Sequence, residues 1–169
     1  MAHIIRKEQL EDIGDINKLH QKRLGPGRFA KTSYRIREKA AYDISCSHVA
    51  LIDENIIGSV RQTWTYFKPE QKCLFLGPLV VEKEASLSGV GQALLKAAIM
   101  SATECEAQAI ILIGDYVYYK KVGFEVAKQL GHCIILPGPA DVNRILIKNI
   151  SLKQDEFLEG NMKPFEKKV

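Results

Sequence analysis

The sequence lacks long apolar runs and long runs of like charge. No stretch approaches the roughly 20 apolar residues that a membrane-spanning helix needs. Polar residues also interrupt any apolar run at the N-terminus, namely His3, Arg6, Lys7 and Glu8. The net charge of +4 is modest, and no basic tract of the kind that binds nucleic acid is present. We therefore expect a cytoplasmic protein that has neither a membrane nor a nucleic acid as its partner.

Cysteine is scarce as well. The four cysteines form no C-x-x-C pair and lack the spacing of metal ligands, and each lies in or near an apolar run: Cys46, Cys73, Cys105 and Cys133. This pattern is typical of reduced core residues, so we predict neither disulfides nor a bound metal.

Length and composition fit one domain. A chain of 169 residues with 46% hydrophobic content is long enough for one well-developed core. No internal repeat or linker divides it. The predicted domain therefore covers residues 1–169, with a polar, frayed end at about 161–169.

The first half of the chain predicts two helices and a β-hairpin. Apolar residues from Leu10 to His20 recur at helical spacing, and Gly25-Pro26-Gly27 ends that helix. The turn-rich tripeptide Asp53-Glu54-Asn55 separates two apolar runs, which predicts a hairpin. The other expected elements are a strand at 3–6, a second helix at 33–42 and hairpin strands at 49–52 and 56–60, the latter able to run on to 67.

The most informative stretch is a buried strand, residues 75–81, that leads into a glycine-rich helix start. Gly89 and Gly91 let the backbone pack tightly at this junction and point several N–H groups at one spot. Such a helix N-terminus favours a phosphate or pyrophosphate. Leu94 stands where a dinucleotide fingerprint needs a third glycine, and Gln92 stands where a nucleotide-triphosphate loop needs lysine. Neither of those two motifs is complete.

Pro78 interrupts the apolar strand. Proline cannot donate a hydrogen bond to a sheet ladder, so pairing should break or bulge near Gly77-Pro78. Backbone groups of the residues after the bulge would then be free for a ligand.

A second segment completes a family pattern. Residues 109–114 look like a strand, and residues 116–124 look like a short helix that ends in Gly123-Phe124, with Tyr119 four residues before the glycine. Together with the bulged strand and the glycine-rich turn, this chain resembles the GNAT superfamily of acyl-CoA N-acyltransferases, and most of all a bacterial branch of predicted acetyltransferases. The resemblance covers about residues 3–150.

The resemblance implies a fold and a cosubstrate. The fold would be α/β, a mixed central sheet with a bulged, splayed strand pair flanked by helices. The remaining expected elements are a helix at 89–106 and strands near 132–136 and 144–150. The cosubstrate would be acetyl-CoA without a metal, and the acceptor a primary amine on a small molecule or a protein. Dimers are common among resembling proteins, so a homodimer is one state that the resemblance allows.

The resemblance also assigns site residues. Leu79, Val80 and Val81 would hold pantetheine like an added strand, and the N–H of Leu79 would stabilise the oxyanion. Tyr119 would bind the cosubstrate and protonate the leaving thiolate. The family motif begins with Gln or Arg where this chain has Ser86, so we expect the backbone to carry most of the pyrophosphate contact. The expected contacts come from Ser86, Leu87, Ser88, Gly89, Val90, Gly91 and Gln92.

Several alternatives stay open. Tyr118 and Tyr119 point about 100° apart on a helix, so one of them can face the sulfur, and both could instead pack the helix. No general base is assigned, because the candidates are unspecific: Glu82, Glu84, Asp115, which suits a helix cap, and His132.

Two groups of side chains near the acceptor side are equally ambiguous. A basic set around the second helix could guide an anionic substrate, but a solvated face is the more frequent explanation: Arg28, Lys31, Arg35 and Arg37. Trp64 and Tyr66 share a strand face that could line a pocket or belong to the core. Besides the acetyltransferase, a non-catalytic acyl-CoA-binding module and an unrelated nucleotide-binding protein remain as hypotheses.

Overall fold

The structure is a computed structural model that describes residues 2–86 and 88–165. Its helices are α1 (Ile13–Leu24), α2 (Thr32–Arg37), α3 (Val90–Glu104) and α4 (Tyr116–Tyr119). Its strands are β1 (Ile4–Lys7), β2 (His48–Ile52), β3 (Asn55–Tyr66), β4 (Lys72–Val81), β5 (Ala109–Ile113), β6 (Glu125–Val126), β7 (Cys133–Ile135), β8 (Ile145–Asn149), β9 (Glu159–Asn161) and β10 (Lys163–Pro164). None of the helices in the described part of the chain is long and apolar enough to cross a membrane.

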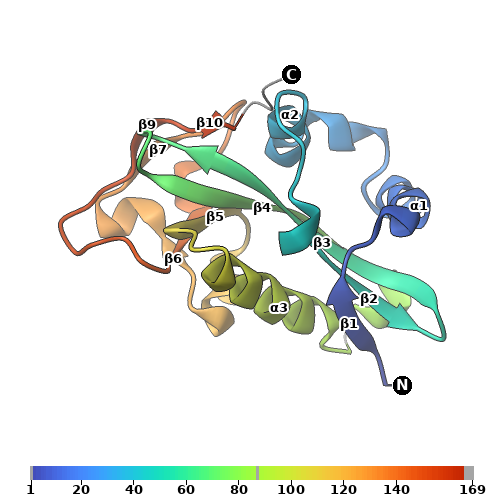
Figure 1. The fold of residues 1–169 in the computed structure, drawn as a ribbon. Coiled ribbons are helices and arrows are strands. Elements are labelled where there is room, and N and C mark those ends of the chain that lie inside the picture. Colours follow the sequence, from blue (N-terminus) through green and yellow to red (C-terminus); the bar gives the residue numbers. More distant parts are fainter. Residues whose placement is uncertain (1, 87, 166–169) are drawn as a thin grey trace.

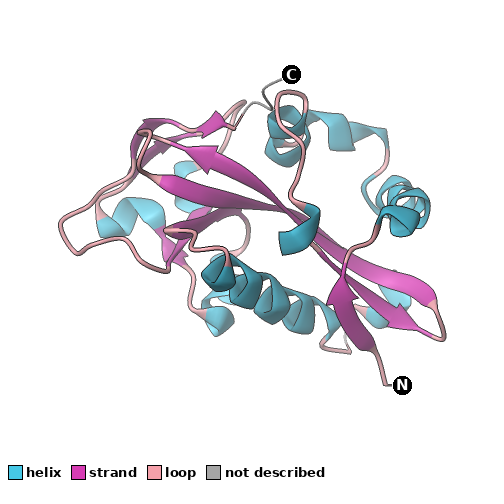
Figure 2. Ribbon diagram, in the orientation of Figure 1, coloured by secondary structure: helices cyan, strands magenta, loops and turns pink. Residues whose placement is uncertain are grey.

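One mixed sheet organises the molecule. Its strand order is β1-β2-β3-β4-β5-β8-β6, with β10 beside the end of β3, and β7 and β9 form a separate parallel pair. All neighbours in the large sheet are antiparallel except β4 and β5, which are parallel. The long strands β3 and β4 run through the middle of the molecule, with helices on both sides (Figure 2). The predicted α/β fold with a mixed, helix-flanked sheet is confirmed.

Helices cover both faces of this sheet (Figure 1), α3 on one and α1 and α2 on the other. Strand β4 contributes side chains to the cores on both faces of the sheet, because successive side chains of a strand point to opposite faces. Leu74 and Leu76 belong to the core cluster that includes α3, whereas Cys73 and Phe75 belong to the cluster that includes Ile36 of α2. The apolar run of β4 is therefore that of a strand buried on both faces.

The middle of β4 contains the irregularity that positions the site. Its register with β3 shifts, so that Gln62 pairs with Leu76 and Val60 pairs with Leu79. Two residues of β4, Gly77 and Pro78, thus lie opposite a single residue of β3. The predicted bulge at this point is confirmed, and the missing N–H of proline explains it.

Strands β4 and β5 separate beyond the bulge. Their parallel register contains two pairs, Leu74 with Ile110 and Phe75 with Ile111. Within the described residues, β4 has no partner on the β5 side from Leu76 onward. The edge that carries Leu79 is therefore open, as the family resemblance implies for a splayed strand pair.

Other elements confirm or correct the sequence predictions. The hairpin forms, with Asp53 and Glu54 at positive φ in its turn, and β3 reaches Tyr66. The second helix ends at Arg37, earlier than predicted, and the chain then turns so that the Tyr42 hydroxyl can donate to the buried Glu8 carboxylate, 2.8 Å away.

The predicted frayed end is wrong for residues 161–165. Residues Lys163 and Pro164 pair with the end of β3, and Met162 is buried. The ring of Phe165 packs on Tyr66, with 4.9 Å between centroids. This apolar contact holds the segment on the sheet, and no pattern in the sequence near Phe165 predicts it. Residues 166–169 lie outside the described part.

All four cysteines are free thiols in the structure. Cys46 and Cys73 are buried and Cys105 is partly buried, but Cys133 is exposed, so the prediction of a core residue is wrong at that position. The sulfurs of Cys46 and Cys105 lie 2.9 Å apart, between the turn before β2 and the end of α3.

Candidate active site

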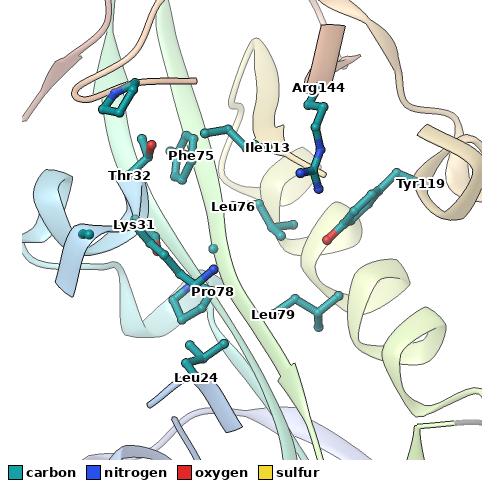
Figure 3. A pocket seen from close by; sticks show the side chains of 14 residues that line it. Leu24, Lys31, Thr32, Phe75, Leu76, Pro78, Leu79, Ile113, Tyr119 and Arg144 are labelled. Carbon is teal, nitrogen blue, oxygen red and sulfur yellow. The ribbon is translucent and has the colours of Figure 1, made fainter. Parts of the chain in front are cut away.

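A cavity of about 320 Å³ lies where β4 and β5 separate (Figure 3). Its wall is formed by the end of α1, the segment that leads into α2, the bulge of β4, the end of β5, α4 and the residue before β8. The bulge residues Gly77 and Pro78 belong to this wall. In Figure 3, Pro78 and Leu79 lie along β4, and Tyr119 lies across the gap from that strand. The splayed strands thus create a space that is open to a ligand.

The backbone of β4 turns its polar groups alternately toward β3 and toward this gap. The N–H of Glu82 donates to the carbonyl of Ile57 on β3 at 2.7 Å. Because the pattern alternates, Val80 also faces β3, whereas the N–H and C=O of Leu79 and Val81 point the other way. The side chain of Arg23 confirms this direction, since its Nε donates to the Val81 carbonyl at 2.9 Å.

Tyr119 reaches the cavity from α4. Asp115 caps this helix by accepting from the N–H of Val117 at 2.8 Å, as predicted. A side chain at Gly114 would overlap the ring of Tyr119, and Phe124 packs against the ring edge at a centroid distance of 5.8 Å. Burial, followed by the neighbouring Tyr118, raises the pKa of Tyr119 to about 12, and the positive charge of Arg144 opposes this shift. The phenol is therefore fully protonated at neutral pH.

The neighbouring Tyr118 points elsewhere. Its hydroxyl lies over Gly91 in the first turn of α3, where any side chain at Gly91 would overlap it. Tyr118 does not line the cavity, and burial raises its pKa. The structure thus brings Tyr119, and not Tyr118, to the gap between the strands.

The glycine-rich turn has the predicted helix start. Gly89 takes a left-handed conformation with φ 81°, which favours glycine. The first helical hydrogen bond runs from Ala93 to the carbonyl of Gly89, which leaves the N–H groups of Val90, Gly91 and Gln92 at the end of the helix without a helical acceptor.

The serines of this turn are engaged within the loop. The N–H and the hydroxyl of Ser86 both donate to the Lys83 carbonyl, and those of Ser88 donate to the Ala85 carbonyl. Their predicted contact with pyrophosphate would require these bonds to change, whereas the three helix amides are already in place. Leu87 lies outside the described residues. All of these phosphate contacts stay predictions.

A family model described as the GNAT family of acetyltransferases matches residues 14–124. The chain belongs to the GNAT acetyltransferase family. Comparison with the curated proteins gave no match.

Solved structures of other GNAT proteins share the fold. The GNAT N-acetyltransferase YhbS of Escherichia coli in complex with CoA is 22% identical, with a TM-score of 0.78 over 96% of this chain and 89% of that one. A GNAT acetyltransferase of Brucella melitensis in complex with acetyl-CoA is 17% identical, with a TM-score of 0.69 over 96% and 95%. The N-acetylglutamate synthase of Neisseria gonorrhoeae, bound to CoA and N-acetyl-glutamate, is 16% identical, with a TM-score of 0.58 over 90% and 36%.

None of the four candidate general bases of this GNAT chain lines the cavity, and three of them interact with other groups. Glu82 pairs with Lys22 at 2.9 Å, and Asp115 caps α4. The Nδ1 atom of His132 accepts from the N–H of Leu158 at 3.0 Å. None of them, nor Glu84, lines the cavity, which has no aspartate, glutamate or histidine in its described wall.

The side chains whose role the sequence left open, Trp64, Tyr66 and the basic residues around α2, differ in whether they reach the cavity. Trp64 donates to Asp43 at 2.8 Å and Tyr66 packs on Phe165, so neither reaches the cavity. Of the basic residues around α2, Lys31 lines the cavity. The others are engaged locally: Arg28 lies over Phe29, Arg35 bonds the Ala30 carbonyl, and Arg37 stacks on Tyr34.

Sequence reasoning missed Arg144, the residue before β8. The antiparallel register of β5 and β8 continues past Ile113 and Ile145, since the N–H of Gly114 donates to the Arg144 carbonyl at 3.0 Å. This pairing places the Arg144 side chain beside Tyr119 (Figure 3). The only signal would have been antiparallel pairing of the two predicted strands, because it brings the end of the first strand beside the start of the second.

Proposed function

We propose that this protein is an N-acetyltransferase that transfers an acetyl group from acetyl-CoA to a primary amine. One observation carries the proposal: the outward backbone of β4 at Leu79 and the side chain of Tyr119 line the same cavity, between strands that have separated. Membership of the GNAT family and the CoA complexes of structures with this fold support it.

The backbone supplies the binding groups. Pantetheine would extend along residues 79–81 as an added strand, since Leu79 and Val81 direct their amides to the gap. The pyrophosphate would lie at the first turn of α3, where amide donors converge. The Val81 carbonyl already accepts from Arg23, so Arg23 would have to move or share that acceptor.

The chemistry would be a direct attack. The amine nitrogen forms a bond to the acetyl carbonyl carbon, the N–H of Leu79 stabilises the oxyanion, and the C–S bond of the tetrahedral intermediate then breaks. Tyr119 donates a hydrogen bond or a proton to the departing sulfur. The proton that the amine loses restores the thiol or the phenol, so the protons balance. With no carboxylate or imidazole in the described wall, water would carry that proton from the amine to the thiolate or to the phenol.

The lack of a carboxylate or imidazole in the described wall favours a second candidate, a module that binds acyl-CoA without turnover. Both candidates predict cosubstrate binding, and product formation separates them. Purified protein should be incubated with acetyl-CoA and a panel of amines, with thiol release as the first readout and mass spectrometry of the acetylated product as the second. N-acetylated product in excess of the uncatalysed reaction supports the transferase. Binding of acetyl-CoA without any product from the panel supports the module.

A further inference from the structure

The cavity is lined by charges of one sign. Among its described wall residues the charged ones are Lys31 and Arg144, both cations. Neither forms an ion pair with a described carboxylate. A site that had evolved for a purely cationic acceptor would place carboxylates here, because like charges disfavour binding.

The two cations approach the gap from opposite walls. Lys31 precedes α2 and extends past Pro78, whereas Arg144 precedes β8 and extends beside Tyr119 (Figure 3). The Nε atom of Arg144 lies 3.4 Å from the Gly114 carbonyl, which leaves its two terminal nitrogens for another acceptor. A guanidinium with both terminal nitrogens available matches a carboxylate in a two-point contact.

The size of the cavity limits the acceptor. A volume of about 320 Å³ has to hold the acetyl end of the cosubstrate as well as the amine, and it is at the low end of the roughly 300–1,000 Å³ of ligand pockets. The hydroxyl-bearing residues Thr32 and Ser33 add polar wall on the α2 side. A small, polar acceptor fits these limits better than a long polyamine.

We propose that the acceptor is a small amine that carries a carboxylate, which Arg144 and Lys31 bind. This inference rests on the proposed function. The two cations would also lower the pKa of the acceptor amine, because they disfavour its charged form. A larger fraction of the acceptor would then be ready to attack, which reduces the need for the general base that the described wall lacks.

Matched acceptors test the proposal. Each of a set of free amino acids is compared with its amide, at saturating acetyl-CoA and at a pH at which both amines are largely deprotonated. We expect kcat/KM to be at least roughly tenfold higher for the carboxylate member of the pair that reacts best. Equal or better use of the amides, or of polyamines, would overturn the inference and leave the proposed acetyltransferase standing.

Substitutions of Arg144 test whether this residue recognises the carboxylate of the acceptor. Arg144→Gln should raise KM for the carboxylate acceptor by roughly ten- to a hundredfold and leave the amide nearly unchanged. Arg144→Lys should recover part of the loss. Arg35→Gln is the matched control, since Arg35 is an exposed arginine of α2 outside the cavity wall. An equal loss for both members of a pair in Arg144→Gln would show a role in rate or folding, and would contradict carboxylate recognition.

Binding distinguishes the failure of this inference from that of the proposed function. If no pair is turned over, calorimetry on the CoA-loaded protein compares N-acetyl amino acids with N-acetyl amino-acid amides. Preferential binding of the carboxylates, lost in Arg144→Gln, supports the subsite even without turnover. Binding of CoA with no such preference overturns the subsite alone. No binding of CoA overturns both.

Discussion

The substitution Tyr119→Phe removes the hydroxyl and keeps the ring, so it separates a catalytic role of the phenol from the packing of the aromatic ring. The ring would stay between Gly114 and Phe124, which hold it by contact with its carbons. The Tyr119 hydroxyl makes no hydrogen bond to the described part of the protein, so its loss leaves no donor or acceptor stranded. The free energy of unfolding should therefore change by less than about 0.5 kcal/mol. The kcat, in contrast, should fall by roughly a hundredfold or more if the phenol assists the leaving sulfur.

The assay combines thiol release with acetyl-CoA titration. Because the pKa of Tyr119 is about 12, the phenol stays protonated up to about pH 10, and the variant should be equally impaired from pH 7 to 10. Tyr116→Phe is the matched control on the same helix, because Tyr116 is exposed. A Tyr119→Phe protein that keeps more than about half of its kcat would refute the role of the phenol. Loss of acetyl-CoA binding would instead mean that the hydroxyl holds the cosubstrate.

Three further predictions rest on the packing. Gly114→Ala should displace the Tyr119 ring, with at least a tenfold loss of kcat and about 1–3 kcal/mol of stability in denaturant unfolding; an unaffected kcat would contradict the contact. Glu8→Ala should cost about 3–5 kcal/mol, because it leaves Arg61 buried without its partner at 2.6 Å; a loss under about 1 kcal/mol in urea unfolding would show that the pair is dispensable. Burial lowers the pKa of His20 from its ordinary 6.5 to about 3. The free energy of unfolding should therefore be highest above pH 6.5 and fall as the pH drops toward 3, because the unfolded chain takes up the proton first. The expected loss at pH 5 is about 2 kcal/mol. His20→Gln should remove this part of the pH dependence, and parallel curves for both proteins between pH 7 and 5 would contradict it.

Local sequence patterns were sufficient to predict the bulge of β4 and the start of α3. Pro78 predicts the bulge because its effect on pairing needs no knowledge of the neighbouring strand. Gly89 predicts the start of α3 for a similar reason, since its backbone conformation is a local property. The family spacing, rather than periodicity, selected Tyr119 over Tyr118, and the structure places Tyr119 in the cavity.

Long-range pairing determined the parts that the sequence did not predict. Arg144 reaches the cavity only because β8 pairs with β5, and β10 is held only because Phe165 meets Tyr66. Neither contact has a signature in the residues nearby. The engagement of Ser86 with the Lys83 carbonyl is also a property of the folded loop. The positions of Arg144, Phe165 and the Ser86 hydroxyl therefore needed the structure, whereas the bulge of β4 and the start of α3 did not.

Acetyl-CoA binding is the most direct test of the central claim, that the gap between β4 and β5 holds an acyl-CoA thioester. Calorimetric titrations of the whole chain should compare acetyl-CoA, CoA and ATP. The account predicts binding of acetyl-CoA and of CoA at one site with a Kd below about 1 mM, and no binding of ATP under the same conditions. Absence of acetyl-CoA binding, or equal binding of ATP, would contradict it.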